Sequence, residues 1–165
     1  MRIYFAGPLF TPYERRFIDE CAGKIRAIGI EVFVPHEHAV PTQHFSPKEV
    51  FEKDWAGLAP ANAVVALLDG PMVDDGTACE IGLFYGLMRH DPTKKGILGL
   101  VTDTRVLRWG QDVWEGKSLN LYVLGCIEEA GQICASIEEC ISVLEHWANA
   151  LTFPESADRT PPAAG

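Results

Sequence analysis

The chain is short of positive charge. It carries 14 lysines and arginines against 23 aspartates and glutamates, a formal net charge of −9 at pH 7. Binding to nucleic acid without regard to sequence depends on clustered lysine and arginine, so nucleic acid is not expected as a partner. The same argument applies to an anionic membrane surface. No apolar run approaches the ~20 residues of a transmembrane helix. The first ten residues also have too short an apolar run for a signal peptide, so we expect a cytoplasmic protein.

The sequence also lacks the common phosphate-binding motifs. Neither GxxxxGK[ST] nor GxGxxG occurs, which argues against nucleotide hydrolases and dehydrogenases built on an α/β fold. Cysteines do not occur at CxxC spacing, so we expect buried, reduced thiols rather than a metal or redox site. The cysteines are Cys21, Cys79, Cys126, Cys134 and Cys140. His36 and His38 have no further ligand at suitable spacing, so we predict no metal and place them at the rim of a pocket.

Short apolar runs alternate with amphipathic segments along most of the 165 residues. Five runs predict strands, and they cover residues 2–6, 30–35, 62–69, 96–103 and 131–136. Helix starts follow Thr11, Ser46 and Ser136, because each is followed three residues later by a glutamate that completes a capping box. A further helix is expected over residues 76–90. Alternation of this kind predicts one doubly wound α/β domain over residues 1–153, with a parallel sheet and helices on both faces. Residues 154–165 are expected to be a disordered tail.

Carboxylates gather where the third predicted strand gives way to a helix. Asp69, Asp74, Asp75 and Glu80 fall within the segment LLDGPMVDDGTACEIG, residues 67–82. Ligands of parallel α/β sheets bind beyond the carboxyl ends of the strands, which is where this segment lies. The residues that follow the first strand, from Gly7 to Phe10, belong to the same edge.

Each acid also has a purely structural explanation. Glu80 could favour the start of its helix, and Asp74 or Asp75 could cap it. Asp54 interrupts an apolar helix face, so it needs either a structural partner or a function. Tyr4 points either into the core or towards the strand ends. If the acids do share a crevice, they suit chemistry at an electron-poor carbon, such as glycosyl transfer.

Three segments, in order, resemble the nucleoside 2-deoxyribosyltransferase family. They are IYFAGPLF (residues 3–10), DDGTACEIG (74–82) and KSLNLYVLG (117–125). The resemblance covers about residues 2–150 and implies a flavodoxin-like fold with a five-stranded sheet. It also implies homo-oligomers built from dimers, including hexamers, and a reaction that needs no cofactor or metal.

The resemblance assigns roles to individual residues. It makes Glu80 the nucleophile and Tyr4 the hydroxyl that orients it, with Asp54 and Asp74 lining the sugar and base site. Phe10 matches an aromatic residue beside the base. The base-recognition residue after the second strand stays open among His36, His38 and Gln43.

The remaining implied residues bind substrate. Asn120 matches an asparagine that reaches the 5′-hydroxyl of the sugar from a neighbouring subunit. The matching segments also contain Gly7, Asp75 and Gly76, which the resemblance assigns to substrate binding. Asp75 could exchange roles with Asp74.

We therefore expect a transferase that moves 2-deoxyribose between purine or pyrimidine bases through a covalent deoxyribosyl ester of Glu80. Nucleosides and free bases would be its partners. Two alternatives remain: hydrolysis of 2-deoxynucleoside 5′-monophosphates, and a nucleotide-binding module without catalysis.

Overall fold

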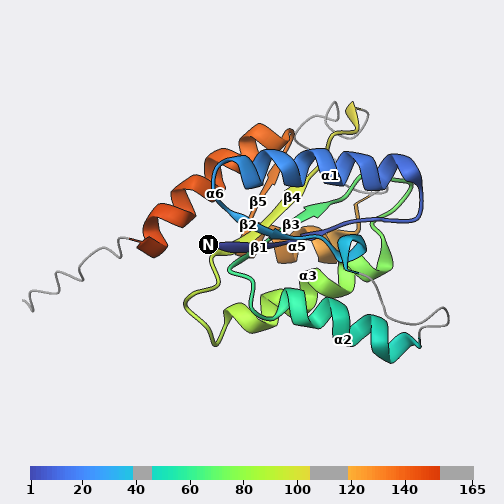
Figure 1. Cartoon of the computed structure of the whole chain (residues 1–165), viewed down its shortest axis with the longest axis horizontal. Coiled ribbons are helices and arrows are strands. Elements are labelled where there is room, and N and C mark those ends of the chain that lie inside the picture. The colour runs from blue at the N-terminus through green and yellow to red at the C-terminus, as the bar shows by residue number, and fades with distance from the viewer. Residues whose placement is uncertain (39–45, 105–118, 153–165) are drawn as a thin grey trace, which may run out of the picture.

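The computed structural model describes residues 1–38, 46–104 and 119–152 (Figure 1). Within these residues the strands form a five-stranded parallel sheet of order β2-β1-β3-β4-β5. The strands are β1 (Arg2–Ala6), β2 (Glu31–Phe33), β3 (Ala63–Leu67), β4 (Gly96–Leu100) and β5 (Gly131–Cys134). This order is that of flavodoxin-like sheets, so the predicted fold class is confirmed. The predicted tail, residues 154–165, and the candidate Gln43 lie outside the described residues.

Helices cover both faces of the sheet (Figure 1). One face is packed by α1 (Pro12–Ala27) and α6 (Ile137–Thr152), and the other by α2 (Pro47–Leu58), α3 (Asp75–Met88) and α5 (Leu121–Ala130). Because side chains alternate along a strand, Ile3 and Phe5 of β1 face α1 whereas Tyr4 faces the α2 and α3 side. The direction of Tyr4 therefore follows from its register in β1.

The predicted helix starts are formed as the sequence indicates. Thr11 Oγ1 accepts the backbone N–H of Glu14 at 3.2 Å, and Glu14 accepts that of Thr11 at 2.7 Å. Ser46 and Glu49 make the same reciprocal pair at the start of α2. A short 3-10 helix, η1 (Pro35–Glu37), follows β2. It brings the segment after β2 to the same edge as the start of α3.

Some expectations about burial were wrong. Helical periodicity predicts that Phe51 of α2 and Ile28 after α1 are buried, but their side chains are 55% and 37% exposed. The buried residues of α2 are Gly57 and Leu58, both in its last turn. All the cysteines are free, yet Cys79 is exposed. No described helix combines the length and the apolar character needed to span a bilayer.

Candidate active site

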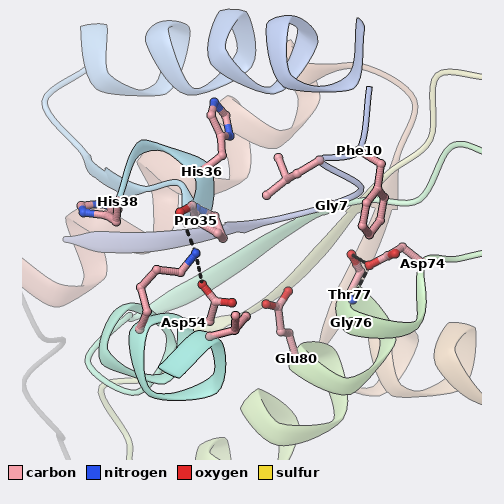
Figure 2. A pocket seen from close by; sticks show the side chains of 13 residues that line it. Gly7, Phe10, Pro35, His36, His38, Asp54, Asp74, Gly76, Thr77 and Glu80 are labelled. Carbon is pink, nitrogen blue, oxygen red and sulfur yellow. Dashed lines mark hydrogen bonds and ion pairs between the residues drawn. The ribbon is translucent and has the colours of Figure 1, made fainter. Parts of the chain in front are cut away.

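A cavity of about 530 Å³ opens at the carboxyl edge of the sheet, beside β1 and β3 (Figure 2). The strand order reverses at this point, which is where ligands of doubly wound sheets bind. Six of the predicted site residues line the cavity: Gly7, Phe10, Asp54, Asp74, Gly76 and Glu80. Figure 2 shows that the carboxyl groups of Asp54 and Glu80 point into the same space.

Glu80 lies in the second turn of α3, and its carboxylate accepts a hydrogen bond from the Tyr4 hydroxyl. The electrostatic effect of a helix N-terminus fades within the first turn, so helix initiation does not explain this residue. The pKa of Glu80 is raised from 4.5 to about 7: burial is the largest cause, Asp54 and Asp74 contribute in the same direction, and the Tyr4 hydrogen bond and Lys53 oppose them. The site therefore holds a carboxylate that is costly to ionise and is oriented by a phenol.

The Tyr4 side chain is fully buried, and burial together with Glu80 raises its pKa, so it remains a hydrogen-bond donor. Its ring stacks on Phe33 with centroids 5.5 Å apart, and the His38 ring also stacks on Phe33 with centroids 4.0 Å apart. α2 approaches Phe33 through Gly57, where a Cβ atom would lie 2.3 Å from the Phe33 ring. Only a glycine fits at that position without displacing the ring that supports Tyr4.

Asp54 projects from α2 and is half-buried. Its Oδ1 atom lies 3.1 Å from the Lys53 Nζ atom, which also donates to the Pro35 carbonyl at 3.0 Å. Burial raises the pKa of Asp54, whereas Lys53 and His38 lower it. The partner that the sequence required for Asp54 is thus the lysine next to it in the chain.

The acids of residues 67–82 have separate tasks. Asp69 accepts the N–H groups of Thr102 at 2.8 Å and Asp103 at 3.0 Å, which fastens the end of β3 to the segment after β4. Asp74 caps α3 by accepting from the Thr77 N–H at 2.9 Å, and it also lines the cavity. Asp75 is exposed and accepts the N–H of the next residue at 2.8 Å, and it is not part of the cavity wall. Asp74 rather than Asp75 therefore fits a role in ligand binding.

Two further features shape the cavity at its β1 side. A Cβ atom at Gly7 would lie 2.9 Å from Ile18 and 3.0 Å from Leu67, so a larger residue would not fit between β1 and the core. Phe10 is 77% exposed although it is aromatic, and its ring stands at the cavity beside Asp74 (Figure 2). An exposed aromatic ring at the edge of a polar cavity is suited to stacking against a planar ligand.

Asn120 lies away from this cavity, on the surface. Its side chain caps α5 by accepting the N–H groups of Tyr122 at 2.9 Å and Val123 at 3.3 Å. Asn120 is therefore the N-cap residue of α5. Its predicted contact with a neighbouring subunit concerns another chain and stays a prediction.

The sequence analysis missed Lys53 and Thr77 as cavity residues, and it named His36 and His38 only as candidates at the rim. His36 pairs through Nε2 with Asp19 of α1 at 2.8 Å. Lys53 could have been noticed because it directly precedes Asp54 on the same helix. Across the three described ranges, no group of three or more His, Cys, Asp or Glu side chains is placed to hold a metal ion.

Fold and site together define an α/β protein with a carboxylate-lined cavity at the point where its strand order reverses. The chain belongs to the nucleoside 2-deoxyribosyltransferase family, whose model matches residues 3–136. This family consists of enzymes that transfer glycosyl groups of nucleosides, and the predicted resemblance is confirmed.

Solved structures give the same fold. A conserved protein from Enterococcus faecalis V583 is 28% identical with a TM-score of 0.73, and the match covers 88% of this chain and 98% of that one. The 2-deoxyribosyltransferase from Bacillus psychrosaccharolyticus is 21% identical with a TM-score of 0.63, covering 86% and 90%. A CMP N-glycosidase from Clostridium botulinum is 18% identical with a TM-score of 0.54, covering 89% and 99%. The comparison with curated protein sequences gave no match.

Proposed function

We propose that this protein transfers 2-deoxyribose between nucleobases, with Glu80 as the nucleophile. The observation that carries the proposal is the largely buried Glu80 carboxylate, which lines a cavity of about 530 Å³ and is oriented by the Tyr4 hydroxyl. A nucleophilic carboxylate has to be fixed in direction and poorly solvated, and both conditions are met here.

The reaction takes place in two displacements. In the first, a Glu80 oxygen forms a bond to the anomeric carbon while the bond from that carbon to the base nitrogen breaks. The electron pair leaves with the base, which takes up a proton, and a deoxyribosyl ester of Glu80 remains. In the second, a nitrogen of another base attacks the same carbon, the ester bond breaks to release the Glu80 carboxylate, and the incoming base gives up its N–H proton, which balances the proton taken up by the first base.

The neighbouring groups have supporting roles in this scheme. Asp54 and Asp74 face the positive charge that develops on the sugar ring, and Phe10 stacks against the base. The base is bounded on its other side by the segment after β2, where His36 and His38 line the cavity. Deoxy substrates are favoured because a 2′-hydroxyl withdraws electrons from the cationic transition state.

The second candidate function is hydrolysis of a nucleoside 5′-monophosphate, with water in place of the acceptor base. The observation in its favour is the fold similarity to a CMP N-glycosidase. A phosphate would require cationic or hydroxyl groups near Gly7 to Phe10, where the segment itself offers Pro8 and Leu9 and the neighbouring Arg15 guanidinium donates to the Leu9 carbonyl at 2.7 Å.

Parallel incubations of a nucleoside and of its 5′-monophosphate separate these functions. With deoxyinosine and free adenine, base exchange gives deoxyadenosine, measured by chromatography, and Glu80→Ala abolishes it while Glu20→Ala on the exposed face of α1 does not. Free deoxyribose as the main product at millimolar adenine would refute transfer, and hydrolysis of deoxyinosine 5′-monophosphate with deoxyinosine left unreacted would support the second candidate. With a slow substrate, mass spectrometry is expected to find a deoxyribosyl group on the peptide that contains Glu80.

We also propose that the enzyme is a homo-oligomer in which Asn120 reaches the site of a neighbouring subunit. The support is the start of α5, where Leu121 is 54% and Tyr122 is 83% exposed directly after the capping Asn120. Large apolar side chains exposed together are typical of contact surfaces.

A further inference from the structure

Lys53 lines the cavity but has no role in the reaction steps proposed above. Its side chain is 21% exposed, whereas Lys48, five residues earlier on the same helix, is 81% exposed. Lysine is rarely withdrawn from water unless its ammonium group finds partners. The partners of Lys53 therefore indicate what its burial achieves.

Two contacts hold the Lys53 ammonium group in place (Figure 2, dashed lines). It donates to the backbone carbonyl of Pro35 at 3.0 Å, and it lies 3.1 Å from Asp54 Oδ1. Pro35 begins η1, on the opposite wall of the cavity from α2. Lys53 thereby connects α2 with η1, and its contact with Asp54 holds that carboxylate between the two elements.

Lys53 shares the cavity with three carboxylates, those of Asp54, Asp74 and Glu80. Glu80 is surrounded by Tyr4 from β1, Asp54 and Lys53 from α2, and Asp74 at the start of its own helix. From η1, His36 and His38 complete the titratable groups that line the cavity. Carboxylates at close range oppose one another's ionisation, and burial adds to this effect. The charge of Lys53 acts in the other direction, lowering the pKa of both Asp54 and Glu80.

We propose that Lys53 is a positioning residue: it fastens Asp54 to the Pro35 carbonyl, and its charge allows Asp54 and Glu80 to be carboxylates at the same time. The inference rests on the proposed function, because it takes Glu80 as the nucleophile that must be ionised when substrate binds. The titration of Glu80 can be measured without substrate, so the role of Lys53 and the proposed function can be refuted separately.

The test is the titration of Glu80 in the free protein, followed by carbon NMR of labelled glutamate, with the resonance assigned through Glu80→Gln. Lys53→Met is expected to raise the Glu80 midpoint by about half a pH unit or more. Lys53→Arg, which keeps the charge, is expected to restore most of the wild-type value. Lys48→Met removes an exposed charge from the same helix and is expected to leave the midpoint unchanged. The acid limb of kcat/KM for base exchange is expected to move with the midpoint.

Two results would overturn the inference. One is a Glu80 midpoint in Lys53→Met within about 0.2 pH units of the wild type, which would show that the charge of Lys53 does not act on Glu80. The other is an equal shift in Lys53→Met and Lys53→Arg, which would indicate disturbed packing rather than lost charge. If Lys53→Met does not fold, Lys53→Gln removes the charge and retains a donor, and the same criteria apply. A protein that shows the expected shifts but exchanges no base would refute the proposed function and support the role of Lys53.

Discussion

Replacing Glu80 by glutamine is expected to make the protein more stable at alkaline pH while abolishing base exchange. The amide has nearly the shape of the carboxyl group, and its oxygen can still accept the hydrogen bond from Tyr4. What the substitution removes is the cost of ionising a buried group, because burial raises the pKa of Glu80 from 4.5 to about 7. Each pKa unit corresponds to 1.36 kcal/mol, so the full cost is about 3 kcal/mol.

The pH window follows from the direction of this shift. Between about pH 4.5 and pH 7 the folded protein holds a proton on Glu80 that the unfolded chain has released. The contribution of Glu80 to stability therefore falls as the pH rises through this range, and it stays low above pH 7. Glu80→Gln has no such dependence, so its advantage over the wild type is expected to grow from below about 1 kcal/mol at pH 5 to about 3 kcal/mol at pH 8.

The assay is urea unfolding of both proteins at pH 5, 6, 7 and 8, followed by circular dichroism. Glu20→Gln serves as the control, because Glu20 is exposed on α1 and its substitution does not relieve a buried charge. Parallel stability curves for the wild type and Glu80→Gln would refute the reasoning, since they would show that Glu80 ionises as easily in the folded state as in the unfolded one. Retained base exchange in Glu80→Gln would separately refute its role as nucleophile.

Three further predictions concern pH, pairing of subunits and packing. For the wild type, kcat/KM is expected to rise about tenfold per pH unit below pH 7 and to level off above it, because Glu80 must be ionised; a flat profile from pH 5 to pH 8 would contradict this. Glu80→Ala and Asn120→Ala subunits, refolded together in equal amounts, are expected to regain about a quarter of the wild-type activity, since ~½ × ½ of the sites combine one intact residue of each kind. Activity of the mixture no higher than the mean of the two variants would show that Asn120 does not serve a neighbour's site. Gly57→Ala is expected to displace Phe33, to cost about 1–3 kcal/mol of stability in urea unfolding and to lower kcat. Gly23→Ala on α1, where a Cβ atom has open space, is the control and is expected to stabilise its helix by about 0.5–1 kcal/mol.

Much of this arrangement could be predicted from the sequence because it depends on local patterns. Alternating apolar runs define the sheet, and the rule that ligands bind at the carboxyl ends of parallel strands places Glu80 and Asp74 at the cavity. The face of β1 that carries Tyr4 was left open, since an isolated tyrosine does not reveal which side of a buried strand faces the site. Lys53 was missed because its partner is a backbone carbonyl on a distant segment, and no periodicity records such a contact.

The segment after β2 was the hardest to interpret. It has neither helical nor strand periodicity, and its histidines were named only as alternatives for recognising the base. Their partners are tertiary ones: His36 meets Asp19 on α1, and His38 stacks on Phe33. Part of this segment, residues 39–45, lies outside the described residues.

Asp74 both lines the cavity and accepts the N–H of Thr77 in the first turn of the helix that carries Glu80. A ligand that hydrogen-bonds to Asp74 therefore draws on the same carboxylate that fixes the beginning of α3. Ligand binding in the cavity and the position of Glu80 on α3 therefore both depend on the Asp74 side chain. Substitutions of Asp74 accordingly measure two quantities at once, and an asparagine, which keeps a capping oxygen, separates ligand contact from helix geometry better than an alanine does.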